Sequence, residues 1–133
     1  MWSPIRVKRK LERRCDIINS SGADMVISIH QNSYVTPKAE GAQVFYYKKS
    51  EESKRIAQIM QGILGEKLGT TRQIKSDVNY YILLHSKLPT IISECGFLSN
   101  PEEEQRLCTE EYQEKVADAL YCGIIEYLMI NMK

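Results

Sequence analysis

The stretch from residue 90 to residue 103, TIISECGFLSNPEE, constrains the fold of the chain more than any other. Residues 90–93 form a short apolar run, which is typical of a buried strand. The run ends on Glu94, and Gly96 then allows the chain to turn. In an open α/β sheet, ligands bind at the carboxyl ends of the strands, so Glu94 is a candidate site residue. The alternative interpretation is an ordinary surface carboxylate beyond a strand end.

The residues after this turn predict the start of a helix. Asn100 is placed as the N-cap and Pro101 as the first helical residue. Glu103 is placed to close a capping box with Asn100. The stretch therefore predicts a strand, a turn that presents one carboxylate, and a helix.

A second stretch has the same character and ends on a histidine. Residues 24–33, DMVISIHQNS, contain an apolar run that leads to His30. Two strands that end in His30 and Glu94 can converge on one edge of a sheet. An imidazole and a carboxylate are the groups from which the site of a metal-dependent hydrolase is built.

The rest of the chain predicts an α/β fold, a mixed sheet flanked by helices, in a single domain over residues 1–133. The remaining elements are a helix opened by Ser3 and Pro4 and ended by Gly22, a strand over 42–47, a helix from Ser50 to Gly69, a strand or extended segment over 80–84, and a helix that starts at Thr109. The loop before residue 42 is too short for a crossover helix, so that strand is expected to be antiparallel to the first or to lie across an edge. Gly123 is expected to allow close packing of the last helix against the sheet.

Composition and charge exclude several classes of protein. Hydrophobic residues make up 43% of the chain and charged residues 26%, which is ordinary for a globular protein. The net charge of +1 gives the chain no overall electrostatic attraction for nucleic acid. The basic residues within 6–14 are interpreted as a solvated helix face, because no aromatic residues lie between them. No apolar run approaches the roughly 18 residues of a transmembrane helix. Residues 1–6 lack the apolar segment of a signal peptide.

The four cysteines, Cys15, Cys95, Cys108 and Cys122, have no C-x-x-C spacing, and a disulfide framework is not expected. Cys95 adjoins Glu94, which leaves a cysteine nucleophile as an alternative chemistry. Such a nucleophile would need His30 or His85 as its base.

Two motifs carry a resemblance to a known family. SIHQN over residues 28–32 and SECGFLSN over 93–100 resemble the SIHxN and E-x-GF-L-S-N motifs of the zinc-dependent N-acetylmuramoyl-L-alanine amidases, the amidase_3 group of cell-wall hydrolases. Residues 80–89 and 101–103 most resemble its sporulation and germination branch. The likeness runs from about Leu11 to about Leu128, with the motifs in the family order.

The resemblance implies a chemistry and a place of action. It implies a peptidoglycan hydrolase that cleaves the amide between N-acetylmuramic acid and L-alanine, outside the cytoplasmic membrane, in the cell wall or spore cortex. His30 would be a zinc ligand, and Glu94 would act as acid and base on the zinc-bound water. Asn32 would contact either the substrate or a residue that holds the metal. His85 would contact the peptide stem or, in the alternative interpretation, would be a polar residue on a turn.

One family motif is missing. A catalytic zinc site needs three protein ligands, and the D-P-G-H-G-like stretch that carries another histidine in the family is absent from these residues. Asp24, Glu40 and His85 are possible substitutes without a recognisable spacing. The chain is therefore expected to be an amino-terminally truncated amidase, inactive as it stands, with an exposed sheet edge through which it could associate.

The rival interpretations are a non-catalytic peptidoglycan-binding remnant of the same fold, a zinc peptidase of related fold that acts on free peptides, and a nucleic-acid binder that uses the basic helix.

Overall fold

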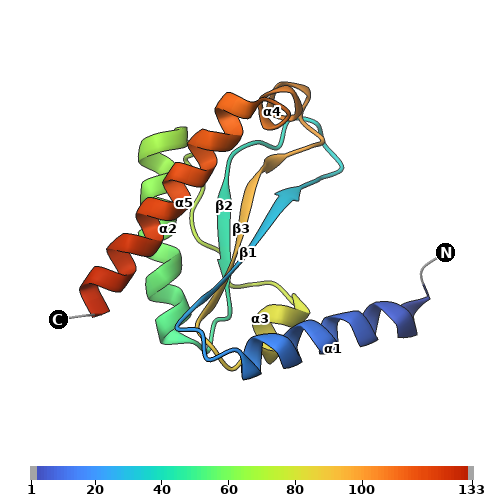
Figure 1. The fold of residues 1–133 in the computed structure, drawn as a ribbon. Coiled ribbons are helices and arrows are strands. Elements are labelled where there is room, and N and C mark those ends of the chain that lie inside the picture. The colour runs from blue at the N-terminus through green and yellow to red at the C-terminus, as the bar shows by residue number, and fades with distance from the viewer. Residues whose placement is uncertain (1–2, 132–133) are drawn as a thin grey trace.

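The structure is a computed structural model, and it describes residues 3–131. In chain order the elements are α1 (Pro4–Ser20), β1 (Val26–Asn32), β2 (Gln43–Tyr46), α2 (Glu51–Leu68), α3 (Tyr81–His85), β3 (Thr90–Phe97), α4 (Pro101–Leu107) and α5 (Glu110–Asn131). The strands form a mixed sheet in the order β1-β3-β2 (Figure 1). The predicted fold class, a mixed sheet flanked by helices, is confirmed.

Strand β3 is the centre of the sheet. It pairs with β1 in parallel and with β2 antiparallel. The strand predicted over residues 42–47 therefore has the expected direction, but β3 lies between it and β1. Within residues 3–131 no strand pairs with the outer edge of β1.

Helices α2 and α5 lie together over one face of the sheet, and α3 lies on the other with α1 beside it (Figure 1). The larger buried cluster lies under α2 and α5. Its fully or almost fully buried members are Val44, Ile56, Ala57, Met60, Leu64, Ile91 and Ala119. A smaller cluster on the α3 face contains Phe45, Leu83 and Ile92. Val44 and Tyr46 belong to the larger cluster, whereas Phe45 and Tyr47 belong to the smaller one, so alternate residues of this segment face opposite sides of the sheet.

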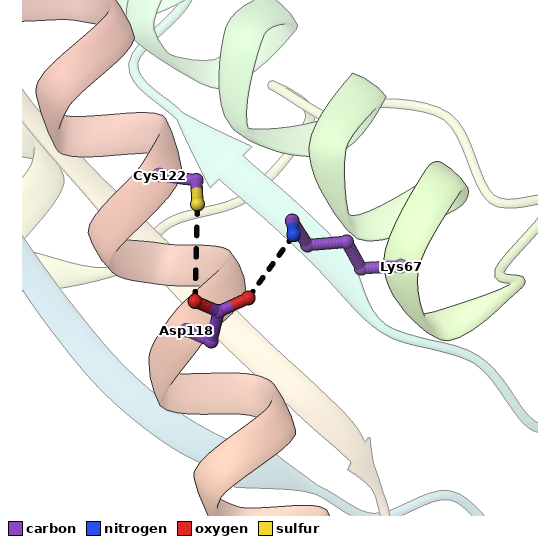
Figure 2. Close-up of polar contacts among 3 residues, drawn as sticks. All are labelled: Lys67, Asp118 and Cys122. Carbon is purple, nitrogen blue, oxygen red and sulfur yellow. Dashed lines mark hydrogen bonds and ion pairs between the residues drawn. The ribbon is translucent and has the colours of Figure 1, made fainter.

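Close packing joins α2 to α5. A Cβ atom added to Gly123 would lie 2.5 Å from the sulfur of Met60, so only glycine lets the two helices approach this closely. The close contact expected at Gly123 is thus present, but its partner is α2 and not the sheet. At the surface, Lys67 Nζ on α2 lies 3.0 Å from a carboxylate oxygen of Asp118 on α5 (Figure 2). Cys122 Sγ lies 4.0 Å from the other carboxylate oxygen of Asp118 (Figure 2).

The helix boundaries follow the predicted caps. The Ser50 side chain caps α2, and Gly69 ends that helix in the left-handed conformation at φ 77°. The Asn100 side chain accepts hydrogen bonds from the backbone N–H groups of Glu102 and Glu103. The capping box is not formed, because Glu103 Oε1 accepts from the backbone N–H groups of Phe97 and Gly41 instead.

The segment expected to be extended over residues 80–84 is a short helix, α3. Its bulky Tyr and Ile residues favour a strand locally. In the folded chain it instead packs Leu83 on Phe45 and Ile92, and the preceding chain at Lys75 already pairs with β2. None of the described helices combines the length and the apolar character that crossing a bilayer requires.

Candidate active site

Glu94 and His30 are neighbours across the sheet. They are register partners on the parallel strands β3 and β1, and Gln43 of β2 lies opposite Glu94 on its other side. Side chains at paired positions project from the same face of a sheet. The two residues that the sequence places at the ends of apolar runs therefore lie side by side on the α3 face.

The register changes immediately beyond this pair. His30 pairs with Glu94, but Asn32 pairs with Phe97, so β3 holds one extra residue between the two pairings. A bulge of this kind re-aims the side chains that follow it, and bulges occur often beside active sites. Its consequence here is that Phe97 and Asn32 line the same cavity.

The environments of the two residues differ. Glu94 is 5% exposed, and its Oε2 atom has no hydrogen-bond partner within the described residues. Burial raises the pKa of the Glu94 carboxyl group because desolvation penalises the charged form. His30 is exposed, and its Nε2 atom lies 2.8 Å from Ser28 Oγ. The pair thus joins a buried carboxyl group to an accessible imidazole.

These groups match a zinc site in kind but not in number. Imidazole nitrogen and carboxylate oxygen are both zinc ligands, and the unpartnered Oε2 of Glu94 is a free acceptor. Between residues 3 and 131, however, no group of three His, Cys, Asp or Glu residues could hold a metal ion. Asp24, Glu40 and His85 therefore do not complete a ligand set with His30.

The Arg72 cavity adjoins this pair and has a volume of about 390 Å³. It is lined by Asn32, Tyr34, Ala39, Gln43, Phe45, Arg72, Lys75, Val78, Tyr80 and Phe97. The sequence predicted only Asn32 among them. The others lie on separate segments of the chain, and no local spacing identifies them as a group.

Two predicted substrate contacts differ in position. Asn32 lines the Arg72 cavity, and its side-chain oxygen accepts a hydrogen bond from the backbone N–H of Ser33 at 2.8 Å. His85 ends α3, where its ring stacks on that of Tyr81 with centroids 4.1 Å apart. The backbone carbonyl of His85 accepts from the Asn19 side chain at 3.2 Å. The structure brings Asn32, and not His85, to the cavity beside Glu94.

Cys95 does not share this site. It belongs to the large cluster under α2 and α5, and it is 3% exposed. Burial and, to a smaller extent, the Glu94 charge raise the pKa of its thiol to about 11. A thiol with that pKa holds very little of the nucleophilic thiolate at neutral pH. The cysteine-nucleophile alternative is therefore not supported. All four cysteines are free, as expected.

Comparisons with known proteins identify relatives along almost the whole chain. The germination-specific N-acetylmuramoyl-L-alanine amidase of Bacillus subtilis is 40% identical over 123 residues, which are 92% of this chain and 52% of that protein. The structure of the CwlD amidase from Clostridioides difficile in complex with the GerS lipoprotein matches with a TM-score of 0.91 and 36% identity, over 98% of this chain and 67% of that one. The catalytic domain of CwlV, an amidase from Bacillus (Paenibacillus) polymyxa var. colistinus, matches with a TM-score of 0.81 and 30% identity. The match covers 89% of this chain and 65% of that one.

The chain spans about half the length of the curated relatives that it matches. The family profile described as N-acetylmuramoyl-L-alanine amidase, Amidase_3, matches residues 5–126. The profile covers most of the chain, and the likeness extends to the fold at 36% identity. The chain therefore belongs to the Amidase_3 family of N-acetylmuramoyl-L-alanine amidases.

Proposed function

We propose that this chain carries the histidine and glutamate portion of a peptidoglycan amidase site, which cleaves the amide between N-acetylmuramic acid and L-alanine. The observation that carries the proposal is the pairing of His30 with Glu94, whose buried carboxylate oxygen lacks a partner beside an accessible imidazole. Membership of the amidase family supplies the reaction class.

Each residue has a distinct role in this proposal. His30 would hold Zn²⁺ through its imidazole, together with ligands that the described residues do not supply. The metal, when bound, polarises a carbonyl group and lowers the pKa of water. Glu94 would take the proton of the attacking water and return a proton to the leaving nitrogen of L-alanine. Asn32 would orient the substrate at the end of β1.

For the residues described, a second function is peptidoglycan binding without hydrolysis. The absence of a three-residue metal group within residues 3–131 favours it. One imidazole leaves a zinc ion largely to water, so Glu94 would have no activated water from which to take a proton. We expect the chain alone to bind zinc weakly and to hydrolyse no peptidoglycan.

The names of the relatives support a proposal for the site of action and for the partners. Several are named as cell wall amidases, and one is named as germination-specific. We propose that this chain acts on cell-wall or spore-cortex peptidoglycan, outside the cytoplasmic membrane. The Clostridioides difficile amidase is described in complex with a lipoprotein, and we propose that the chain also associates with protein through the unpaired edge of β1.

The test compares the chain alone with a chimera that carries the amino-terminal portion of the Bacillus subtilis relative. The measurements are metal content by mass spectrometry and the release of L-alanine amino termini from sacculi. In an active chimera, His30→Ala should lose both metal and activity. Glu94→Gln should keep the metal and lose about 10²–10⁴-fold in turnover. If His85 contacts the peptide stem, His85→Ala should raise KM and leave kcat unchanged.

Glu104→Gln is the matched control, because Glu104 is an exposed carboxylate on α4. It should change neither metal content nor turnover. Full activity in Glu94→Gln would exclude the role proposed for that residue. Robust zinc-dependent hydrolysis by the 133-residue chain alone would show that other residues complete the metal site.

A further inference from the structure

Two cations line the Arg72 cavity without a carboxylate partner. Arg72 and Lys75 both contribute to its wall. The ion pairs within residues 3–131 are Lys8–Glu12 and Lys67–Asp118, and neither cavity residue takes part in one. Solvent-exposed cations are common, but two unpaired cations in one concave site favour an anionic ligand.

The guanidinium of Arg72 is held in a fixed position. Its Nε atom donates to the backbone carbonyl of Glu40 at 2.6 Å, and its Nη1 atom donates to the side-chain oxygen of Gln43 at 3.2 Å. The guanidinium carbon also lies 4.7 Å from the centre of the Phe97 ring. Nη2 donates to no described residue, so the group is pre-organised and keeps free N–H donors.

Lys75 is anchored through its backbone and not through its side chain. Its N–H donates to the carbonyl of Val44 at 3.0 Å, and its carbonyl accepts from the N–H of Tyr46 at 3.1 Å. These two bonds attach residue 75 to the free edge of β2. Its exposed ammonium group has no hydrogen bond to the described residues and can follow a ligand in the cavity.

The cavity adjoins the candidate active site, although Glu94 and His30 do not line it themselves. Gln43, which accepts from Arg72, is the register partner of Glu94 on β2. Asn32, which lines the cavity, is two residues beyond His30 on β1. A substrate whose scissile amide lies at Glu94 would therefore extend one of its two sides into the cavity.

We propose that the Arg72 cavity is a subsite for a free carboxylate of the stem peptide, the part of peptidoglycan on the alanine side of the scissile amide. The assignment rests on the proposed amidase function. The glycan strand is neutral, whereas the stem peptide carries carboxylate groups. A planar guanidinium that is already oriented, with a mobile ammonium beside it, complements a carboxylate and gives a neutral sugar no comparable advantage.

The test titrates the isotope-labelled 133-residue chain with L-alanyl-D-glutamate whose γ-carboxyl group is blocked as a methylamide, and follows amide chemical shifts. A matched titration uses L-alanyl-D-isoglutamine with the same γ-methylamide, in which an uncharged carboxamide replaces the α-carboxylate. We expect shifts at the residues that line the cavity and an affinity about tenfold higher for the acid than for the amide. Arg72→Gln should remove most of this preference, and Lys75→Gln should reduce it about threefold.

Two controls keep the test decisive. Lys115→Gln removes an exposed cation on α5 and should leave binding unchanged. Lys75→Gln removes the charge of an exposed side chain that has no hydrogen bond to the described residues, so its effect does not depend on folding. Equal affinity for the acid and the amide, an unchanged preference in both cavity variants, or no saturable binding of the acid would overturn the subsite.

The outcome is separable from that of the amidase proposal. Hydrolysis of sacculi by the chimera, without a carboxylate preference in the cavity, would overturn the subsite alone. Carboxylate-dependent dipeptide binding in the cavity, without hydrolysis by the chimera, would support the subsite and count against the amidase assignment.

Discussion

Strands β1 and β3 both form from apolar runs of the sequence, but they differ in burial. VISIHQN forms β1 and TIISECGF forms β3, and the two are parallel neighbours. All eight residues of β3 are buried, whereas none of the seven residues of β1 is. The difference lies in what covers each strand. Strand β3 has a strand on both sides and packs against α2, α3 and α4, whereas β1 has one neighbouring strand and no helix packs closely on it within the described residues. An apolar run thus predicts a strand, but the strands and helices around it determine its burial.

The candidate site takes one residue from each of these two strands. Glu94 belongs to the buried strand and His30 to the exposed one. Burial keeps the carboxyl group in surroundings that disfavour its charge, which suits proton transfer. Exposure leaves the imidazole open to a ligand that approaches from outside the described residues. The contrast between the strands therefore gives the two groups complementary properties.

The largest expected effect comes from the same substitution made on each strand. Ile91 on β3 is fully buried, so Ile91→Ala should lower the free energy of unfolding by about 2–5 kcal/mol. Ile29 on β1 is 59% exposed, so Ile29→Ala should change it by less than about 0.5 kcal/mol. Urea denaturation followed by circular dichroism measures both values. Equal losses would show that β1 is covered in solution.

Local signals in the sequence predicted much of the fold. The ends of the apolar runs, the caps at Ser50 and Asn100 and the terminating Gly69 are each set by a few adjacent residues. The adjacency of His30 and Glu94 also follows from local signals, since two strands that end in polar residues at one sheet edge bring them together. The roles assigned to the two residues stay predictions.

The features that the sequence did not reveal depend on distant contacts. The strand-like residues of α3 become a helix because they pack on Phe45 and Ile92 from other segments. Arg72 enters the cavity wall through the backbone of Glu40, the side chain of Gln43 and the ring of Phe97. No spacing within residues 70–80 indicates those partners, so this cavity becomes visible only in the folded chain.

A second prediction concerns the end of β3, where the bulge interrupts regular pairing. Glu103, which is 6% exposed, accepts from the backbone N–H groups of Phe97 at 3.0 Å and Gly41 at 2.9 Å. Glu103→Ala would leave these donors unsatisfied and should cost about 1–3 kcal/mol in the free energy of unfolding. Glu103→Gln keeps an acceptor and should cost less.

Exposed Glu104 on the same helix provides the control, and Glu104→Ala should change the free energy of unfolding by less than about 0.5 kcal/mol. The loss in Glu103→Ala is also expected to appear locally, as faster hydrogen exchange at the amides of Gly41 and Phe97. Unchanged exchange at both amides would mean that Glu103 does not hold this end of β3.

The smallest expected change in stability comes from a substitution on β1, Ile29→Lys. Its main expected effect is on the association of one chain with another. The outer edge of β1 offers unpaired backbone groups within residues 3–131, and exposed Ile29 adds apolar surface beside them. An edge of this kind favours pairing with another strand, and a lysine placed on it opposes such pairing. We therefore expect the chain to associate with increasing concentration in sedimentation velocity experiments. Ile29→Lys should weaken that association and leave the urea midpoint nearly unchanged. A wild-type chain that sediments as a monomer at every concentration would show that β1 is closed to partners, and the contrast with β3 would then be one of burial alone.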